Sequence, residues 1–250
     1  MNTPLRLAAL LIAGVSLLGC ESGERKLTLA VTAEEPAPSI AETVRTTLGA
    51  RGFDLKIEAT ADPRVVLESI ARQTLDLAII EEPDQPIAGL QTIAPLYPSV
   101  LHVLYAEDQA SNDFGELISG ASIYAGPPGG ASYRLLMKLA DEFGVPSSQL
   151  NILDNPWTVR PDVFFVFGGL LSKDSISQLQ GYQLYSFASE SDAPGSSVAD
   201  AIALKHHHLR PFVFPRGIYH SLAKRSVVSL SIRTVLVAHE SFDEDLAFDV

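Results

Sequence analysis

Apolar runs alternate with helical hydrophobic patterns along the first 80 residues of the chain. Residues 27–31 and 75–80 are near-continuous apolar runs, typical of strands that are buried on both faces of a sheet. Residues 53–59 alternate between apolar and polar as a third strand. Between the strands, apolar residues recur at spacings of three and four over residues 40–48 and 63–70, as on one face of a helix. This order of strand, helix, strand, helix and strand predicts a parallel sheet with right-handed crossovers.

Local signals predict where the first two helices begin and end. Ser39 and Glu42 have the Ser-x-x-Glu spacing of a capping box, so we expect the first helix to begin with Ser39 as its N-cap. Gly52 is expected to end that helix as a C-cap. Asp62 and Pro63 predict the start of the second helix, because proline is favoured in a first turn.

The second half of the chain repeats this order of strands and helices. Residues 90–106 predict two strands that are interrupted at Tyr97 and Pro98. Residues 210–220 and 226–240 are extended and rich in β-branched side chains, which favours strands. Further strands are expected at residues 123–126, 151–153, 163–167 and 182–188, and further helices at 132–143, 172–179 and 198–204.

Two such halves, followed by a late return to strands, predict a two-lobed α/β fold. We expect mixed or parallel sheets with flanking helices and a central cleft. One lobe is expected to comprise residues 27–104 and 211–250, and the other residues 105–210. The chain has 250 residues, which is enough for one large domain or two small lobes.

Residues 123–143 carry the most distinctive pattern in the chain. A short apolar strand breaks into the Gly/Pro turn of residues 126–130, and a helical pattern follows. The free N–H groups and the positive dipole end of such a helix favour a carboxylate or phosphate. Ser132 is expected as an N-cap or as a donor to the same anion, and Arg134 as its charge partner. The alternative is an ordinary tight connection between a strand and a helix.

Loops at the carboxyl ends of the predicted strands are the expected ligand-binding region, as in open α/β sheets. Backbone amides and a hydroxyl would hold the acid, and a nearby arginine would add charge. Arg216 suits bidentate carboxylate binding, with an ordinary surface arginine as the alternative, and Tyr219 would supply a wall or a hydroxyl. The predicted ligand-binding set is Thr32, Glu81, Gly129, Gly130, Ala131, Ser132, Arg134, Arg216 and Tyr219.

Composition narrows the class of protein. Apolar residues make up 46% of the chain and charged residues 19%, which is a globular composition. The formal net charge of −12 argues against a nucleic-acid surface, because proteins that bind polyanions are typically basic. A small anionic ligand remains compatible with this charge, since the donors inside a pocket decide its binding.

The N-terminal segment predicts export and lipid anchoring. Residues 1–19 combine Arg6 with an apolar run that is too short to span a membrane. The run ends in Leu-Leu-Gly-Cys, which resembles a bacterial lipobox, and this implies cleavage before Cys20 and lipidation of its sulfur. Residues 20–26 would then be a lipidated linker. We expect a periplasmic or other extracytoplasmic protein that is anchored to the membrane through lipid.

Two other clusters suggest chemistry but have simpler explanations. Glu81, Glu82 and Asp84 have the residue types of an acid/base pair or a divalent-metal site, although acidic loops are usually solvated. The tract of residues 205–208 contains three histidines, but adjacent side chains point in different directions. Ser132 lacks the Gly-x-Ser-x-Gly context of a nucleophile elbow. We therefore predict no metal, no cofactor and no enzymatic activity.

The series of motifs resembles the TAXI family of TRAP-transporter solute-binding receptors, within the type II periplasmic-binding-protein architecture. The likeness extends over residues 70 to 250, and the motifs occur in the family's order. The segments that carry it are residues 75–80, 94–108, 126–132, 162–169, 215–221 and 226–238.

This resemblance implies an extracytoplasmic receptor whose two lobes close over a small organic acid or an amino acid such as glutamate. It also implies a TRAP-type membrane permease as the partner that receives the solute. The first loop departs from the family, because residues 32–39 are rich in acids and prolines where a glycine-rich turn is usual. A diverged sensor or partner-interaction module is therefore the alternative function, followed by a lipid-anchored hydrolase.

Overall fold

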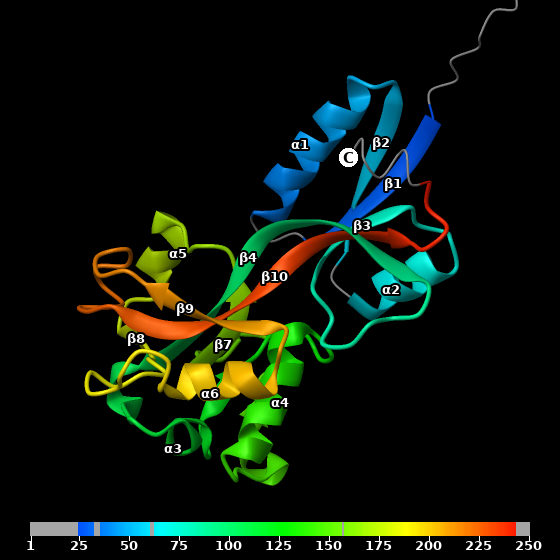
Figure 1. The fold of residues 1–250 in the computed structure, drawn as a ribbon. Coiled ribbons are helices and arrows are strands. Elements are labelled where there is room, and N and C mark those ends of the chain that lie inside the picture. Colours follow the sequence, from blue (N-terminus) through cyan, green and yellow to red (C-terminus); the bar gives the residue numbers. More distant parts are fainter. Residues whose placement is uncertain (1–24, 33–35, 61–62, 157, 244–250) are drawn as a thin grey trace, which may run out of the picture.

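Two groups of strands and helices are joined by two long antiparallel strands, β4 (Leu90–Ala106) and β10 (Val227–His239), as Figure 1 shows. The structure is a computed structural model, and it describes residues 25–32, 36–60, 63–156 and 158–243. Within these residues, ten strands form one mixed sheet in the order β2-β1-β3-β10-β4-β7-β5-β6, with β8 paired to β4 and β9 paired to β10. The expected signal peptide and Cys20 lie outside the described residues.

The first group is the predicted strand–helix–strand–helix–strand unit. Strands β1 (Arg25–Val31), β2 (Phe53–Ala59) and β3 (Leu77–Glu81) are parallel, and β10 continues the sheet antiparallel to β3. Helix α1 (Ala37–Gly49) covers one face of these strands, and helix α2 (Pro63–Ala71) covers the other. Side chains alternate along β1, so Leu29 packs in the cluster under α1 and Ala30 in the cluster under α2.

The first helix begins earlier than the capping box predicts. Its N-cap is Pro36, and Ser39 already lies in the first turn, so the prediction that Ser39 caps the helix is wrong. The N–H groups of a first helical turn have no partner within the helix, so proline, which lacks an N–H, loses nothing there. Its φ is also that of a helix, and Pro36 and Pro38 therefore allow the helix to begin before Ser39. Gly52 follows the helix with φ +86°, two residues beyond the C-cap Ala50.

The second group contains three parallel strands, β5 (Ser122–Tyr124), β6 (Asn151–Ile152) and β7 (Val163–Gly168). Helices α3 (Phe114–Ile118), α4 (Ala131–Glu142) and α6 (Val198–Lys205) supply the core on one face. The other face is covered by α5 (Lys173–Gln178), β8 (Tyr182–Leu184) and β9 (Leu209–Phe214). Two short 3₁₀ helices complete the described elements, Glu107–Gln109 and Ser147–Gln149.

Strand β4 differs from the prediction of two strands broken at Tyr97 and Pro98. It is continuous over 17 residues, and Pro98 pairs with Arg233 of β10. The ladder shifts register at two points in β10, after Thr234 and after Leu236. The extra residues, Ile93 and Leu96, belong to β4, and Pro95 and Pro98 both keep partners in β10, so the strand does not end at the prolines.

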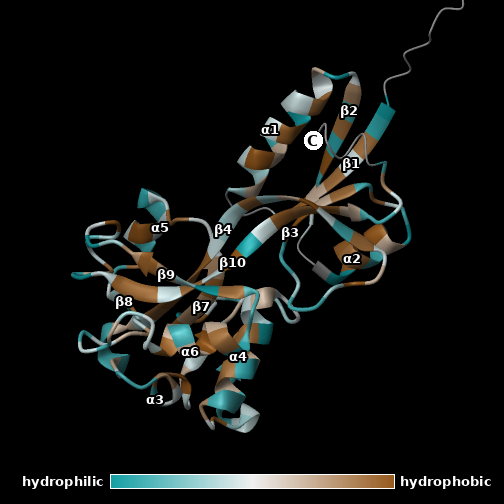
Figure 2. Ribbon diagram, in the orientation of Figure 1, coloured by the Kyte–Doolittle hydropathy of each residue, from teal (hydrophilic) through white to brown (hydrophobic). Residues whose placement is uncertain are grey.

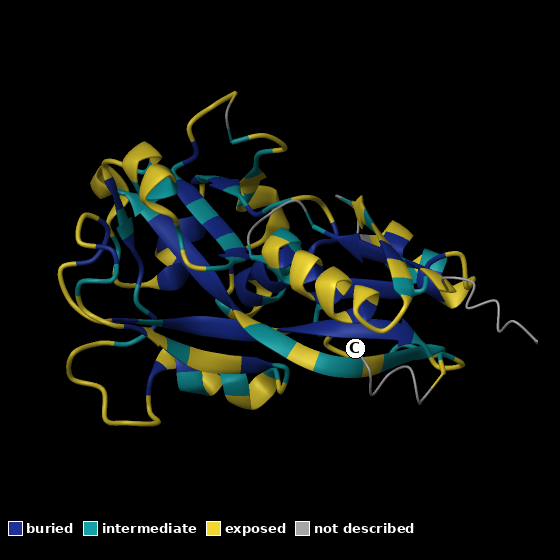
Figure 3. Cartoon of the chain, turned by 90° about the horizontal axis from the view of Figure 1, so that it is seen from above, coloured by how far each residue is buried: buried dark blue, intermediate teal, exposed yellow. Residues whose placement is uncertain are grey.

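The two long strands connect the groups physically. Most residues of β10 are buried (Figure 3), and the strand is apolar at both ends but hydrophilic near its middle (Figure 2). Phe214 and Tyr219, from the stretch expected in the first lobe, pack in a cluster with Tyr182 and Leu184 of the second group. Among the described residues, no helix is both long and apolar enough to span a membrane.

Candidate ligand-binding cleft

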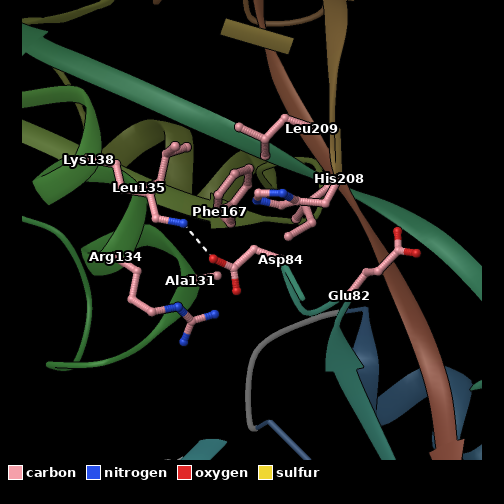
Figure 4. Close-up of a pocket in the computed structure, with 10 residues that line it drawn as sticks. Glu82, Asp84, Ala131, Arg134, Leu135, Lys138, Phe167, His208 and Leu209 are labelled. Atoms are coloured by element: carbon pink, nitrogen blue, oxygen red, sulfur yellow. Dashed lines mark hydrogen bonds and ion pairs between the residues drawn. The ribbon is translucent and has the colours of Figure 1, made fainter. Parts of the chain in front are cut away.

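Two small cavities lie where the two groups meet, and both are lined by Phe167. The first, here called the hinge cavity, has a volume of about 50 Å³ and lies against β4 and β10. The second, here called the charged cavity, has a volume of about 20 Å³ and lies beside α4 (Figure 4). The hinge cavity is lined by Thr32, Ile79, Ile80, Glu81, Tyr97, Ser99, Phe167, Gly168, Gly169 and Thr234.

The hinge cavity occupies the position that the strand order predicts. Thr32 follows β1, Glu81 ends β3 and Gly168 ends β7, so the carboxyl ends of strands from both groups face the same space. Thr32 and Glu81, predicted from the sequence as ligand-binding residues of the first lobe, both line it.

The charged cavity brings cations of α4 against an acid from the opposite group. Arg134 and Lys138 are four residues apart and so lie on one face of α4. Asp84, in the loop after β3, points toward Lys138 in Figure 4, and Lys138 Nζ lies 2.5 Å from Asp84 Oδ2. The hydrogen bond from Lys138, with smaller contributions from Arg134 and His208, lowers the pKa of Asp84. This ion pair ties the two groups together.

A second ion pair fixes the loop that carries Asp84. Glu82 accepts two hydrogen bonds from Arg233 of β10, from Nε at 2.7 Å and from Nη2 at 2.5 Å. The backbone N–H of Glu82 also donates to the carbonyl of Arg233 at 2.7 Å. Such a bidentate contact fixes both the orientation and the distance of the Glu82 carboxylate relative to Arg233. The loop after β3 is thereby directed toward α4.

The acids and histidines do not form a metal site. Glu82 is paired with Arg233 and Asp84 with Lys138, so both carboxylates are already balanced by cations. His206 instead contacts Glu142, whereas His208 lines the charged cavity. In the part of the chain that the structure describes, no group of three or more His, Cys, Asp or Glu could hold a metal ion.

The glycine turn before α4 is a contact between the two groups. Gly129 has φ +82°, and its carbonyl accepts a hydrogen bond of 2.5 Å from Arg134 Nη1. A Cβ at this position would lie 2.5 Å from Nη2 of Arg64, so the Arg64 side chain of α2 lies directly against the turn. The positive φ favours glycine at this position, whereas the Arg64 guanidinium is the end of a flexible side chain and could shift.

The amides of the turn are used differently from the prediction. The N–H of Gly130 donates to the carbonyl of Pro127 at 3.0 Å, so it closes the turn and does not point at a ligand. Gly130 is also the N-cap of α4, which leaves Ser132 inside the first turn, so the prediction of Ser132 as N-cap is wrong. The Ser132 hydroxyl accepts a hydrogen bond from Phe167 N at 2.9 Å and thereby joins α4 to β7. Ala131 lines the charged cavity.

Arg216 and Tyr219 do not reach the cleft. Tyr219 is 2% exposed, and its hydroxyl accepts a hydrogen bond from Leu171 N at 2.8 Å and contacts His102 Nε2 at 3.1 Å. Arg216 is exposed on another surface beside His220. The segment after β9 closes the outer core of the second group, so neither side chain takes the position that the sequence suggested.

Several residues of the cleft were not predicted as ligand-binding residues. Lys138 was detectable from its helical spacing to Arg134. Asp84, Arg64 and His208 were not, because their proximity to α4 depends on how the two groups are joined.

The cleft is closed in this conformation. Sites for small molecules usually have volumes of about 300–1,000 Å³, and a single water needs a cavity of about 10–15 Å³. The hinge cavity of about 50 Å³ therefore has room for only a few water molecules. A solute would need the two groups to separate, which breaks the contact between Lys138 and Asp84.

No family model and no characterised protein sequence matches the chain. Among solved structures, the effector binding domain of a BenM variant superposes with TM-score 0.56 at 10% identity, covering 90% of this chain and 91% of that one. A histidine kinase sensor domain with similarity to periplasmic binding proteins gives TM-score 0.55 at 11% identity, covering 90% and 87%. Arginine-bound truncated ArgBP from T. maritima gives 0.51 at 11% identity, covering 90% and 92%. At these identities the likeness shows the fold, which is the two-lobed α/β fold of periplasmic binding proteins.

Proposed function

We propose that this chain is an extracytoplasmic solute-binding lipoprotein that captures a small carboxylate-bearing solute between its lobes. The solute class is an organic acid or an amino acid such as glutamate, and the lobes deliver it to a TRAP-type membrane permease. The fold supports a binding role, while the lipid anchor at Cys20 and the permease rest on the sequence resemblances.

The observation that carries the proposal is the position of the Asp84 carboxylate. It lies against Lys138, with Arg134 and His208 close enough to affect its pKa, in the space between the lobes. The protein's own carboxylate thus already makes the charge-assisted contact that a solute carboxylate needs. A solute acid binds by displacing Asp84 when the lobes open, and it then joins the lobes in place of Asp84.

Binding of a solute panel to three variants tests this proposal. Removal of the competing charge in Asp84→Asn should raise the affinity for the preferred acid about tenfold, which is about 1.4 kcal/mol. Loss of the cation in Lys138→Met should lower it at least tenfold. Lys205→Met is the matched control, because Lys205 pairs with Glu142 outside both cavities. Isothermal titration with organic and amino acids measures all three.

The proposal fails if no acid binds to the wild-type chain or to Asp84→Asn. It also fails if Lys138→Met and Lys205→Met bind an acid equally well. Lipidation at Cys20 is checked by the mass of the protein purified from membranes, and delivery by crosslinking of the loaded receptor to a permease.

A sensor or partner-interaction module is the second candidate function. The closed cleft with its internal ion pair favours it, because such a protein needs no exchangeable solute. In that case the acid panel gives no binding, and a membrane protein that is not a permease co-purifies with the chain.

A further inference from the structure

A larger pocket lies on the opposite face of β7 and borders the hinge cavity only at residues 167–169. The pocket, here called the outer pocket, has a volume of about 770 Å³, within the range of about 300–1,000 Å³ that small-molecule sites occupy. Phe165 and Phe167 point into the core shared with α4, whereas Phe164 and Val166 point to the outer face and are only half-buried. Helix α5 covers this face incompletely, which leaves the pocket open beside it.

Apolar and aromatic side chains form most of the pocket wall. Phe164 packs edge-to-face against Tyr124 and against Tyr182, with ring centroids 6.1 and 5.3 Å apart. Leu104 and Leu179 extend the apolar wall. These rings and aliphatic groups favour a ligand with an apolar body, because binding removes apolar surface of both the ligand and the pocket from water.

The mouth of the pocket is mixed in polarity, because the exposed residues of the lining are Arg160, Leu170, Ser172 and Gln178. Leu170 lies at the rim and is 58% exposed, one of the most exposed large apolar side chains among the described residues. Exposed apolar surface that continues into a pocket marks a binding site more often than isolated exposed residues do.

The polar groups at the floor are already satisfied. The hydroxyl of Tyr182 donates to the carbonyl of Pro161 at 2.5 Å, and His102 contacts the Tyr219 hydroxyl through Nε2 at 3.1 Å. His102 is 1% exposed and carries no charge at neutral pH, because burial disfavours its protonated form. The floor therefore offers ring surface and no charge.

Arg160 is the one charged side chain among the described residues that line the outer pocket, and the lining contains no Asp or Glu. Its guanidinium lies 4.6 Å from the centre of the Tyr182 ring, which fixes its position at the wall. Nε donates to the Tyr182 hydroxyl at 3.1 Å and Nη2 to the Gln180 carbonyl at 2.7 Å. Arginine has five donors, so these two contacts leave three. Arg160 also borders a neighbouring depression whose lining includes Glu107, Asp108 and Asp162.

From this combination we propose that the outer pocket is a second binding site, separate from the cleft, for a hydrophobic monocarboxylate. The apolar body lies on Phe164 and Val166, and the carboxylate faces Arg160. The class excludes the polar acids proposed for the cleft, because a second charged group would be buried against apolar walls without a partner.

Isothermal titration of the full chain with octanoate and with benzoate tests this site. Ser175 lines the pocket from α5, so Ser175→Phe should fill it and lower the affinity for the bound acid at least tenfold. Ser177 lies on the same helix, is exposed and is not part of the lining, so Ser177→Phe is the matched control and should bind like the wild type. Arg160→Gln should bind the acid about tenfold more weakly but bind 1-octanol unchanged.

Each outcome decides the proposal. Binding of one or both acids that is lost in Ser175→Phe and kept in Ser177→Phe supports it, and the preferred probe shows whether the body is aromatic or aliphatic. No binding of either acid at millimolar concentration overturns it, as does equal binding by the two serine variants or by Arg160→Gln and wild type. Lys138→Met leaves this binding unchanged, so failure of the outer pocket and failure of the cleft proposal are distinguishable.

Discussion

The cleft and the outer pocket share a boundary but have opposite character. Phe167, Gly168 and Gly169 line both the hinge cavity and the outer pocket. On the cleft side the space is small and its charges are paired within the protein, as for Lys138 and Asp84. On the outer side the space is large and apolar, with the single cation of Arg160.

This difference indicates two different costs of binding. A solute in the cleft must break an internal ion pair and separate the lobes, so its measured affinity is reduced by the free energy of opening. A ligand in the outer pocket needs no such opening and gains chiefly from burial of apolar surface. Substitutions at the paired charges of the cleft and at the neutral floor of the outer pocket should therefore differ in their effects on stability and binding.

The neutral floor of the outer pocket should make the protein sensitive to mild acid. Burial lowers the pKa of His102 from 6.5 to about 4. Between pH 6.5 and about pH 4, His102 is protonated in the unfolded chain but neutral in the folded chain. The free energy of unfolding therefore falls as the pH decreases through this window. The full loss is about 3 kcal/mol, at about 1.4 kcal/mol per pKa unit. Urea unfolding at pH 7, 5.5 and 4.5 measures it.

The slope of the unfolding free energy against pH, and not its absolute value, identifies His102 as the residue responsible. His102→Gln should be less stable at pH 7 but should lose most of the pH dependence between 6.5 and 4. The pKa of His208 is also lowered, chiefly by burial, so a smaller slope of the same sign remains. His207→Gln, at an exposed position, should keep the wild-type slope, and an unchanged slope in His102→Gln would contradict the neutral floor.

The contact between the lobes at the glycine turn should be sensitive to a single methyl group. Gly129→Ala forces a left-handed residue and also displaces the guanidinium end of the flexible Arg64 side chain, and should cost about 1–2 kcal/mol. Gly126 has a similar φ of +73° but no atom within 4 Å of an added Cβ, so Gly126→Ala should cost only about 1 kcal/mol. Urea midpoints of the two variants measure the difference. Equal midpoints would show that Arg64 does not press on the turn.

Removal of the cation that pairs with Asp84 should open the cleft at little cost in stability. The side chains of Lys138 and Asp84 are 39% and 33% exposed, so solvent screens the pair and Lys138→Met should cost about 0.5–1 kcal/mol. The cost should disappear at high salt. Small-angle scattering should show a larger radius for Lys138→Met but not for Lys205→Met. An unchanged radius would mean that other contacts hold the lobes together.

The smallest effect is expected at the loop anchor. Arg233→Lys keeps the charge but loses the two-pronged contact with Glu82, and should cost about 0.5 kcal/mol. It should also strengthen acid binding in the cleft slightly, because Asp84 is then held less firmly against Lys138 and competes less with a solute acid. Urea unfolding and titration measure the two effects, and Arg225→Lys, whose partner Glu190 lies outside both cavities, is the control.

Much of the first lobe could be predicted from sequence because its determinants are local. The apolar runs that become β1 and β3 carry buried residues on both faces, and the helical spacing of Val44 and Leu48 gives the buried face of α1. The same logic placed Thr32 and Glu81 at the carboxyl ends of strands, where they line the hinge cavity.

Elsewhere local patterns misled the interpretation. Tyr97 and Pro98 look like a break between strands, yet pairing with β10 keeps β4 continuous. Tyr219 has the residue type of a ligand contact, yet its hydroxyl is used by Leu171 and His102 inside the core. In both cases the deciding partner is more than 40 residues away, beyond the reach of any periodicity.

By itself the sequence determined the alternation of strands and helices and the strand ends at which a cleft forms, because burial and backbone preference act over a few residues. Only the tertiary structure decided that Asp84 lies against Lys138, that Arg64 presses on Gly129 and that the outer face of β7 stays partly uncovered. These features depend on how two lobes are joined through β4 and β10, and a contact between distant segments exists only once the long strands have fixed their separation.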